Sequence, residues 1–374
     1  MRVAEFFAGI GLVRQALESC GFKVVWANDV DPNKLAMYRQ NFDASDFHLD
    51  DIRNIHGEDL PDIELAAASF PCTDLSLAGN RRGLQGAQSG MYWEFTRILG
   101  QMGARRPRMV VVENVPSFAT SRGGRDLYVA LSQLNQLGYW CDLLVIDARL
   151  FVPQSRPRLF VIGSRSPLPC NSDWQSNALR PTWMKRFVAA YPDLKLQAVP
   201  LALPEPDRRM LADVVERLSD DDARWWDLER RSRFTAELSA IQHTRLVKMM
   251  DLPTVNWATA YRRSRQGKPA WEIRADAISG CLRTARGGSS KQALVEAGQG
   301  SFRVRWMTAV EYARLQGAVD YKFEGVSENR ALFGFGDAVC VPAVAWLGRN
   351  YLAPLLSDEF PQALGARQQS LVLA

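Results

Sequence analysis

The stretch Val3-Ala4-Glu5-Phe6-Phe7-Ala8-Gly9-Ile10-Gly11 is typical of an apolar strand followed by a Gly-x-Gly turn. Directly after it, apolar residues recur at helical spacing, namely Leu12, Val13, Ala16, Leu17 and Cys20. The glycines let the backbone approach a bound ligand closely. A strand, a tight turn and a helix in this order predict the start of an α/β domain.

Short apolar runs alternate with helical patterns from the start of the chain to about residue 163. The predicted strands are Val3 to Phe7, Lys23 to Ala27, Leu65 to Phe70, Met109 to Val112, Leu143 to Ile146 and Leu159 to Ile162. Strands that alternate with helices form parallel sheets covered on both faces. We therefore expect an α/β fold with a doubly covered parallel sheet.

The regular pattern breaks after Arg165. Two proline-containing segments, residues 166–169 and 200–206, indicate a linker and a less regular module. Within this module, Ser219 to Asp222 predicts the start of a helix over the following Ala223 to Trp226, because acidic residues favour a helix N-terminus. Regular patterning returns after about Ser301.

The last part of the chain has its own helix signals. Thr308 to Glu311 has the spacing of a capping box, and Val339 to Leu347 is typical of a closing helix. The stretch from Leu355 to Ala374 is expected to be a frayed tail.

Composition sets the class of protein. The chain has 374 residues, 23% of them charged and 47% hydrophobic, so it can bury a large core in two domains or one enlarged domain. Its six cysteines show no CxxC pair and it has three histidines, which favours neither a zinc site nor a disulfide framework, and we expect no metal.

Charge and the N-terminus bear on partners and location. The net charge is +5, and arginines outnumber lysines, which is compatible with a nucleic-acid partner or with genomic base composition alone. The N-terminus does not have the layout of a signal peptide, and no apolar run approaches membrane-spanning length. We therefore expect a cytoplasmic protein that is not in a membrane.

Three polar groups at predicted strand ends suggest a cofactor site. Gly9 and Gly11 form the first turn, Asp29 ends the second strand where a carboxylate commonly accepts ribose hydroxyls, and Asp51 with Ile52 could bind an exocyclic amine and a purine face. No third glycine has the spacing of a dinucleotide site. The structural alternatives are a tight turn without ligand and solvated loop acids.

Four further residues suggest a reacting centre. Cys72 follows one apolar strand, Glu113 ends the next, and Arg156 and Arg158 alternate before another. Residues two apart in an extended chain share a face, so both guanidiniums are expected to reach one place and stabilise a thiolate, an oxyanion or a phosphate. The alternatives are a packed cysteine, a carboxylate that anchors an ion pair, and surface arginines.

Six motifs together resemble the DNA cytosine-5 methyltransferases of bacterial restriction-modification systems. They occur in the order and approximate spacing of that family, and span the chain from Met1 to about Leu347. The motifs are Phe7 to Gly11, Phe70-Pro71-Cys72, Glu113-Asn114-Val115, Gln154 to Arg158, Arg305 to Gly317 and Gly336 to Val339.

The resemblance implies a fold, a cofactor and its ligands. The fold is a Rossmann-like methyltransferase domain with a smaller, irregular target-recognition domain, and the cofactor is S-adenosyl-L-methionine. The implied cofactor-binding residues are Phe7, Gly9, Gly11, Asp29, Asp51, Ile52, Pro71, Asp337 and Val339. The chain departs from the family at Leu12, where a second glycine is common, and at Asp337, where asparagine is common. Asp337 keeps an acceptor but lacks the amide donor.

The resemblance also implies domain boundaries. Residues 1–165 are expected to form the catalytic and cofactor-binding domain and residues 166–300 the target-recognition domain. Residues 301–352 are expected to return to the catalytic domain, and residues 353–374 to form a tail.

The implied reaction is transfer of a methyl group to carbon 5 of a cytosine in duplex DNA. Cys72 would attack carbon 6, Glu113 would hold the ring at nitrogen 3 and share a proton, Arg158 would buttress the base, and Arg156 would order the loop. A stacked base is unreachable, so the cytosine must be flipped out.

Sequence recognition is expected within residues 166–300, where Tyr261 to Arg265, Arg274 and Arg283 to Lys291 combine guanidiniums, hydroxyls and glycines. The expected DNA contacts are Gln154, Arg262, Arg263, Arg283, Thr284, Arg286, Gly287, Gly288 and Lys291. A solvated basic loop is the structural alternative.

Partners and rival functions follow from the same resemblance. The expected partners are double-stranded DNA and a cognate restriction endonuclease that acts separately. One alternative is a cytosine-5 methyltransferase of transfer RNA, and another is a non-catalytic DNA-binding protein on the same scaffold. The large variable region favours DNA over transfer RNA, and the intact set of Cys72, Glu113, Arg156 and Arg158 favours an enzyme.

Overall fold

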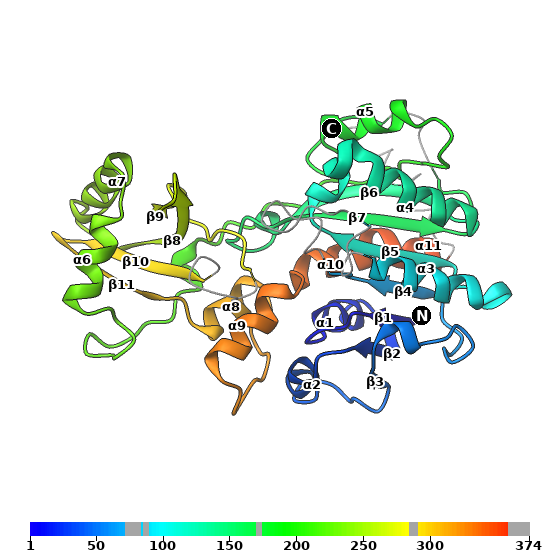
Figure 1. Ribbon diagram of the computed structural model, residues 1–374, viewed down its shortest axis with the longest axis horizontal. Helices are drawn as coiled ribbons and strands as arrows, with labels where there is room; N and C mark the ends of the chain where they lie inside the picture. Colours follow the sequence, from blue (N-terminus) through cyan, green and yellow to red (C-terminus); the bar gives the residue numbers. More distant parts are fainter. Residues whose placement is uncertain (72–83, 85–89, 170–173, 284–290, 358–374) are drawn as a thin grey trace, which may run out of the picture. The chain divides into compact units, whose positions relative to one another are not determined.

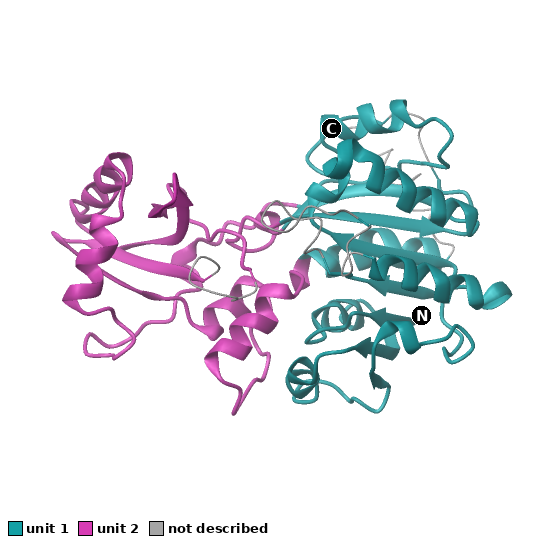
Figure 2. Ribbon diagram, in the orientation of Figure 1, with its two compact units in different colours: residues 1–147, 157–204, 343–374 teal, residues 148–156, 205–342 magenta. Residues whose placement is uncertain are grey.

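The computed structural model describes residues 1–71, 84, 90–169, 174–283 and 291–357. The chain divides into two compact units, coloured separately in Figure 2. The large unit comprises residues 1–147, 157–204 and 343–374, and the small unit comprises residues 148–156 and 205–342.

The large unit is built on a seven-stranded sheet with the order β3-β2-β1-β4-β5-β7-β6. The four central contacts, β1 with β2 and β4, β2 with β3, and β4 with β5, are parallel. The strands are β1 (Arg2–Phe6), β2 (Lys23–Asp29), β3 (Phe47–Leu49), β4 (Leu65–Ala68), β5 (Met109–Asn114), β6 (Trp140–Asp147) and β7 (Pro157–Ser164). All six predicted strands are confirmed, and β3 was not predicted.

The sheet is mixed, which corrects the expectation of a wholly parallel one. Strand β7 runs antiparallel to both β5 and β6. The connection between β6 and β7, residues 148–156, is shorter than the dozen or more residues that a parallel crossover needs. This reversal brings the first residues of β7 to the same sheet edge as the carboxyl end of β5.

Helices cover both faces of this sheet (Figure 1). The large unit contains α1 (Leu12–Glu18), α2 (Pro32–Tyr38), α3 (Met91–Gln101), α4 (Arg125–Gln136), α5 (Thr182–Ala190) and α11 (Ala353–Leu356). The main core packs alternate strand residues such as Phe6, Ala66 and Val110 against α3 and α4. The period-two pattern of the strands and the helical period of α3 and α4 therefore meet in one core.

The small unit has a four-stranded antiparallel sheet with the order β11-β10-β8-β9. Its strands are β8 (Asn256–Arg265), β9 (Lys268–Ile273), β10 (Gln292–Gly298) and β11 (Ser301–Trp306), and its helices are α6 (Leu228–Ala236), α7 (Ala240–Met250), α8 (Ala309–Leu315) and α9 (Glu328–Asp337). Helix α10 (Val341–Leu347) continues the chain into the large unit. A core rich in aromatic residues, including Trp226, Phe234 and Trp271, lies on one face of the sheet.

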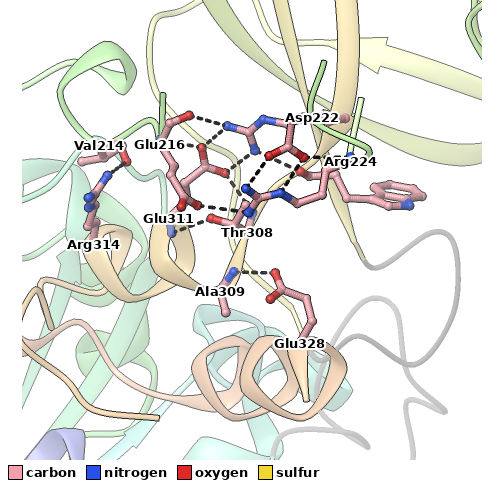
Figure 3. Close-up of polar contacts among 11 residues, drawn as sticks. Val214, Glu216, Asp222, Arg224, Thr308, Ala309, Glu311, Arg314 and Glu328 are labelled. Atoms are coloured by element: carbon pink, nitrogen blue, oxygen red, sulfur yellow. Dashed lines mark hydrogen bonds and ion pairs between the residues drawn. The ribbon is translucent and has the colours of Figure 1, made fainter. Parts of the chain in front are cut away.

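The other face of this sheet carries a fully buried ion pair between Arg305 and Glu311. Two hydrogen bonds of 2.9 and 2.5 Å join their side chains, and both residues are 0% exposed. Glu311 also accepts the backbone amides of Thr308 and Glu216, as Figure 3 shows. Thr308 caps α8 in return, which confirms the predicted capping box.

One sequence prediction in the small unit, a helix after Ser219 to Asp222, differs from the structure. Helix α6 begins at Leu228 with Asp227 as its cap, so no helix follows Ser219 to Asp222 over Ala223 to Trp226. Asp222 instead caps a turn and pairs with Arg224, which lowers the pKa of Asp222 to about 2. The local acidic signal therefore stabilises a turn.

The compact units also divide the chain at other residues than the predicted domains. Residues 166–204 belong to the large unit, and residues 301–342 to the small unit. Residues 353–356, expected in the tail, form α11 with Leu356 buried. The functional roles of the domains stay predictions.

One helical stretch, Glu328–Leu356, is long and apolar enough to cross a membrane, which the sequence prediction did not expect. It has 29 residues and a mean hydropathy of 1.6 in its most apolar window. Because 72% of that window is buried inside the protein, these apolar residues serve as core.

Candidate functional site

The carboxyl ends of five parallel strands, β1 to β5, lie along one edge of the large sheet. Predicted site residues follow these strands: Phe7 after β1, Asp29 at the end of β2, Asp51 after β3, Pro71 after β4 and Glu113 near the end of β5. Ligands of open α/β sheets bind at this edge.

The turn after β1 is held in a left-handed conformation. Phe7, Gly9 and Gly11 have φ angles of 58°, 58° and 82°. A Cβ at Gly9 would meet no atom closer than 3.9 Å, whereas one at Gly11 would lie 2.6 Å from the Phe42 ring. Gly9 therefore leaves open space beside the backbone, and Gly11 is required for packing of the turn against Phe42.

Asp29 fixes this turn from the neighbouring strand. Its carboxylate accepts the backbone amide of Gly9 at 2.9 Å and that of Asp31 at 2.9 Å. Beside it, the buried Asn28 side chain donates to the backbone carbonyls of His48 and Asp50, at 2.9 and 2.8 Å. Asn28 thus ties the end of β2 to the chain after β3, a role that the sequence prediction missed.

Asp51 and Ile52 are placed differently from each other. Asp51 caps a short 3-10 helix and pairs with Arg53 at 2.5 Å, and the hydrogen bond from the Arg53 side chain lowers the Asp51 pKa to about 2. The Ile52 side chain is 4% exposed and belongs to the main core. Contact of Ile52 with a purine stays a prediction, to be made through the small part of the side chain that is exposed.

A buried carboxylate lies beneath the glycine turn. Glu5, on the central strand β1, is 1% exposed, and among the described residues neither of its carboxylate oxygens has a hydrogen-bond partner. Loss of hydration raises its pKa to about 8, partly offset by the positive charge of Arg14 on α1. Burial therefore disfavours the ionised form of Glu5.

The strand that leads to Cys72 is fixed at its end. The buried Asn114 side chain donates to the backbone carbonyl of Phe70 at 3.0 Å, and the Phe70 ring packs against Tyr92 and Phe118. Pro71 is half-buried, and Cys72 lies outside the described residues. Asn114 is the last residue of the apolar strand β5, and its role in fixing Phe70 was not predicted from the sequence.

Glu113 and Arg158 meet at the same edge. Arg158 Nε lies 2.9 Å from Glu113 Oε1, and the two side chains are 15% and 12% exposed. Glu113 is paired across the ladder with Phe160, and Arg158 is two residues before Phe160 on β7. The antiparallel turn of β7 therefore delivers the guanidinium to the carboxylate, and the pair keeps partial access to solvent.

Arg156 has its own set of acceptors in the small unit, and the expectation that both guanidiniums reach one place stays a prediction. The Arg156 side chain is 2% exposed and donates to the backbone carbonyls of Leu282, Gly336 and Ala338. It thereby joins the chain before residue 284 to the end of α9. This placement suits a residue that orders the chain, as predicted.

The side chain of Gln154 is also engaged in hydrogen bonds within the small unit. It is 0% exposed; its side-chain amide donates to the Leu315 carbonyl at 2.7 Å and accepts the Leu282 amide at 3.1 Å. The prediction that Gln154 contacts DNA is therefore not supported by its placement, because its amide is engaged in protein contacts. The sequence could not reveal these partners, which lie more than a hundred residues away along the chain.

The remaining predicted DNA contacts divide into three groups. Arg263 and Arg283 are exposed, whereas Arg262 is paired with Glu237 and Lys291 donates to Asn329. Thr284, Arg286, Gly287 and Gly288 lie outside the described residues.

The two cofactor candidates in the small unit differ in exposure. Asp337, at the end of α9, is exposed, and Val339 is 5% exposed. In the part of the chain that the structure describes, no group of three or more His, Cys, Asp or Glu residues is arranged to hold a metal ion.

Comparison with known proteins gives one family across most of the chain. A family model described as C-5 cytosine-specific DNA methylase matches residues 1–352. The type II methyltransferase M.Bsp6I of Bacillus sp. (strain RFL6) is 35% identical over 170 residues, which cover 44% of this chain and 53% of that protein. M.HhaI of Haemophilus parahaemolyticus is 31% identical over 169 residues, 45% of this chain and 50% of that protein. The chain thus matches about half the length of these relatives.

Solved structures match over nearly the whole chain. The S. pombe Dnmt2 methyltransferase has a TM-score of 0.61 at 19% identity, covering 95% of this chain and 99% of that one. A putative DNA modification methyltransferase encoded within an E. coli prophage has a TM-score of 0.56 at 14% identity, covering 93% and 97%. At these identities, the likeness shows the shared fold, a Rossmann-like α/β methyltransferase.

Proposed function

This chain belongs to the C-5 cytosine-specific DNA methylase family, and from that premise we propose that it methylates carbon 5 of a flipped-out cytosine in duplex DNA. The observation that carries the proposal is the Glu113–Arg158 pair at the carboxyl edge of the sheet. It lies beside β4, the strand that leads into Cys72 and whose end is tied to β5 by Asn114.

We propose S-adenosyl-L-methionine as the cofactor, bound at the turn after β1. The open space at Gly9, the ordered carboxylate of Asp29 and the left-handed turn at Phe7 fit a ligand that approaches the backbone closely. Asp51, Ile52, Pro71, Asp337 and Val339 are the further proposed contacts. When bound, the cofactor supplies an electrophilic methyl group to carbon 5.

The proposed chemistry of the protein begins at Cys72. Its thiolate forms a carbon–sulfur bond to carbon 6. The electron pair of the 5,6 double bond then forms a double bond between carbons 4 and 5, and the pair of the 3,4 double bond moves to nitrogen 3. The resulting enamine makes carbon 5 nucleophilic. Glu113 accepts a hydrogen bond from the exocyclic amine and shares a proton with nitrogen 3. The negative charge that develops at nitrogen 3 is thereby stabilised. After methylation, a base removes the proton from carbon 5, the double bond forms again and the carbon–sulfur bond breaks.

The two arginines have separate proposed roles. Arg158 holds the Glu113 carboxylate and buttresses the oxygen at carbon 2 of the base, because its guanidinium reaches the same sheet edge. Arg156 is a positioning residue, because its guanidinium is buried against the carbonyls of Leu282, Gly336 and Ala338. A catalytic contact from Arg156 is not needed in this assignment.

Sequence recognition is proposed for the small unit, and a role in restriction-modification for the protein. The type II relatives support this context, and a cognate endonuclease is the expected separate partner. Bisulfite sequencing of a plasmid from cells that express the protein tests both activity and target site. Methylated cytosine at one recurring sequence supports the proposal, and an unmodified plasmid contradicts it.

The decisive test is a covalent trap. Duplex DNA that contains 5-fluorocytosine should form an irreversible adduct with the wild-type protein, because fluorine cannot leave as a proton does. The C72A variant should form no adduct and transfer no methyl group, yet bind DNA and cofactor. Methyl transfer by C72A at a rate comparable to wild type would overturn the mechanism; adduct formation on transfer RNA alone would favour the transfer-RNA alternative. Binding without any adduct would favour a non-catalytic protein.

A further inference from the structure

The β8–β9 hairpin of the small unit has two chemically different faces. Residues paired across the hairpin share a face: Tyr261 with Glu272, Arg263 with Ala270, and Arg265 with Lys268. The opposite face carries the pairs Ala260 with Ile273 and Arg262 with Trp271. We call the first set the outer face and the second the core face.

The core face is already used for folding. Ala260, Trp271 and Ile273 belong to the buried cluster of the small unit. Arg262 forms two hydrogen bonds of 2.8 and 2.6 Å to the Glu237 carboxylate at the end of α6. Arg262 therefore anchors the hairpin to a helix.

The outer face has an excess of positive charge. Arg263 and Arg265 share a single carboxylate, Glu272, at 3.2 and 2.5 Å, while their side chains stay 46% and 64% exposed. Lys268 is also exposed, so this face carries three positively charged side chains and one carboxylate. The Glu272 side chain is only 19% exposed, but the two guanidiniums that share it face solvent, and ion pairs of such exposed cations contribute about 0 to 1 kcal/mol.

The geometry of this face suits a linear polyanion. Arg263 and Arg265 are two residues apart on one strand, about 7 Å along its axis. Arg263 lies over the Tyr261 ring at 4.5 Å and donates to the Tyr261 hydroxyl, which restrains its guanidinium. The hairpin ends in a tight turn at Gln266 and Gly267, with φ angles of 50° and 77°, and its tip is exposed. A two-stranded ribbon of this kind fits the major groove of duplex DNA.

We propose that the outer face of the β8–β9 hairpin binds the phosphate backbone of duplex DNA through Arg263, Arg265 and Lys268. The proposal rests on the proposed function, since it names the surface by which the small unit holds its substrate. It also reassigns Arg262, a predicted DNA contact, to the support of the hairpin. Phosphate contacts set the position of a protein on DNA, whereas base contacts set its sequence preference.

The test is the salt dependence of binding to a random-sequence duplex, measured by fluorescence anisotropy with the full chain. Each phosphate contact contributes about 0.9 to the slope of log affinity against log salt concentration. R263Q/R265Q should therefore bind more weakly at low salt, with a slope reduced by about two. The matched control, R186Q/R233Q, removes the same charge from exposed positions on α5 and α6 and should leave the slope unchanged.

The outcomes separate the two proposals. A wild-type protein that binds no duplex DNA overturns the proposed function. If wild type binds the duplex and R263Q/R265Q has the same salt slope as wild type, the hairpin assignment alone is overturned. The assignment is also overturned if R263Q/R265Q loses affinity for transfer RNA but not for the duplex. A separate variant, R262Q, should lower the melting temperature and keep the wild-type slope; a slope reduced as in R263Q/R265Q would contradict its supporting role.

Discussion

Two Arg–Glu pairs, one in each unit, have the same chemical groups and opposite surroundings. Arg305 and Glu311 are fully buried, and four donors converge on the two oxygens of Glu311. Arg158 and Glu113 are 15% and 12% exposed, and among the described residues Arg158 is the partner of Glu113. A carboxylate whose acceptor sites are all occupied by protein donors stabilises the fold and has no site left for a substrate donor. A carboxylate with sites left over can receive a substrate.

The E113Q variant should have the largest effect, and it should be on turnover. Glutamine keeps the shape but can neither carry the charge nor share the proton, so kcat should fall by about 10² to 10⁴-fold. The melting temperature should change little, because the pair is partly exposed. Single-turnover methyl transfer and thermal unfolding measure the two effects.

Helix α3 supplies a matched control for E113Q. Glu94 pairs with Arg97 at 2.7 Å, and the two side chains are 26% and 31% exposed. E94Q removes a carboxylate from an Arg–Glu pair of the same large unit and should keep wild-type kcat. Equal turnover by E113Q and wild type would mean that Glu113 is only an ion-pair anchor.

The E311Q variant should instead lower stability, by about 3 to 5 kcal/mol, because it leaves the buried Arg305 charge without its counter-charge. Chemical denaturation monitored by the tryptophans of the small-unit core measures this loss. The control is E229Q, since Glu229 and Arg233 lie 3.6 Å apart with side chains 81% and 69% exposed. That variant should change the free energy of unfolding by less than about 1 kcal/mol. Similar losses in the two variants would show that the burial of Arg305 and Glu311 is not what stabilises the small unit.

The difference between the two pairs was only partly predictable from the sequence. Apolar runs located the strands, and the position of Glu113 at the end of one run correctly predicted the sheet edge at which it lies. The direction of β7 was not predictable, because an apolar run has no polarity that marks it parallel or antiparallel. The ion pair of Arg158 with Glu113 depends on that direction.

The structural roles in the small unit were harder to predict. The Thr308–Glu311 spacing revealed the helix cap, but nothing local marked Arg305 as the buried partner of Glu311. Gln154 was predicted to contact DNA, whereas its partners lie at residues 282 and 315. Arg156 was predicted to order a loop, but its partners at residues 282, 336 and 338 were not foreseen. Tertiary contacts over such separations leave no periodic signal in the chain. The residue type indicated polarity, and only the fold decided what each polar group contacts.

Glu5 provides a third case, a buried carboxylate with no hydrogen-bonding partner in the described part of the chain, and E5Q tests it. Burial raises its pKa to about 8 from 4.5. Below about pH 4.5 the group is protonated in both the folded and the unfolded chain, so its ionisation contributes nothing. Between pH 4.5 and 8 the folded chain binds more protons than the unfolded one, and stability falls as pH rises. E5Q lacks this loss and should be more stable than wild type by about 4 kcal/mol at pH 8, with little difference at pH 4.

The charges that face Glu5 make this pH profile specific. Arg14 and Glu18 on α1, Asp29 on β2 and Tyr38 on α2 surround it. D51N is the control of opposite sign: hydrogen bonding from Arg53 lowers the Asp51 pKa to about 2, so the stability due to Asp51 is present above about pH 4 and is lost as pH falls towards 2. Denaturant unfolding from pH 2 to 8 should therefore show E5Q gaining on wild type as pH rises above about 4.5, and D51N less stable than wild type at pH 7 with a difference that shrinks towards pH 2. A pH-independent difference between E5Q and wild type would mean that Glu5 has the same pKa in the folded and the unfolded chain. The ionised carboxylate would then be compensated by Arg14 as its ion-pair partner, and the contrast with Glu113 and Glu311 would be lost.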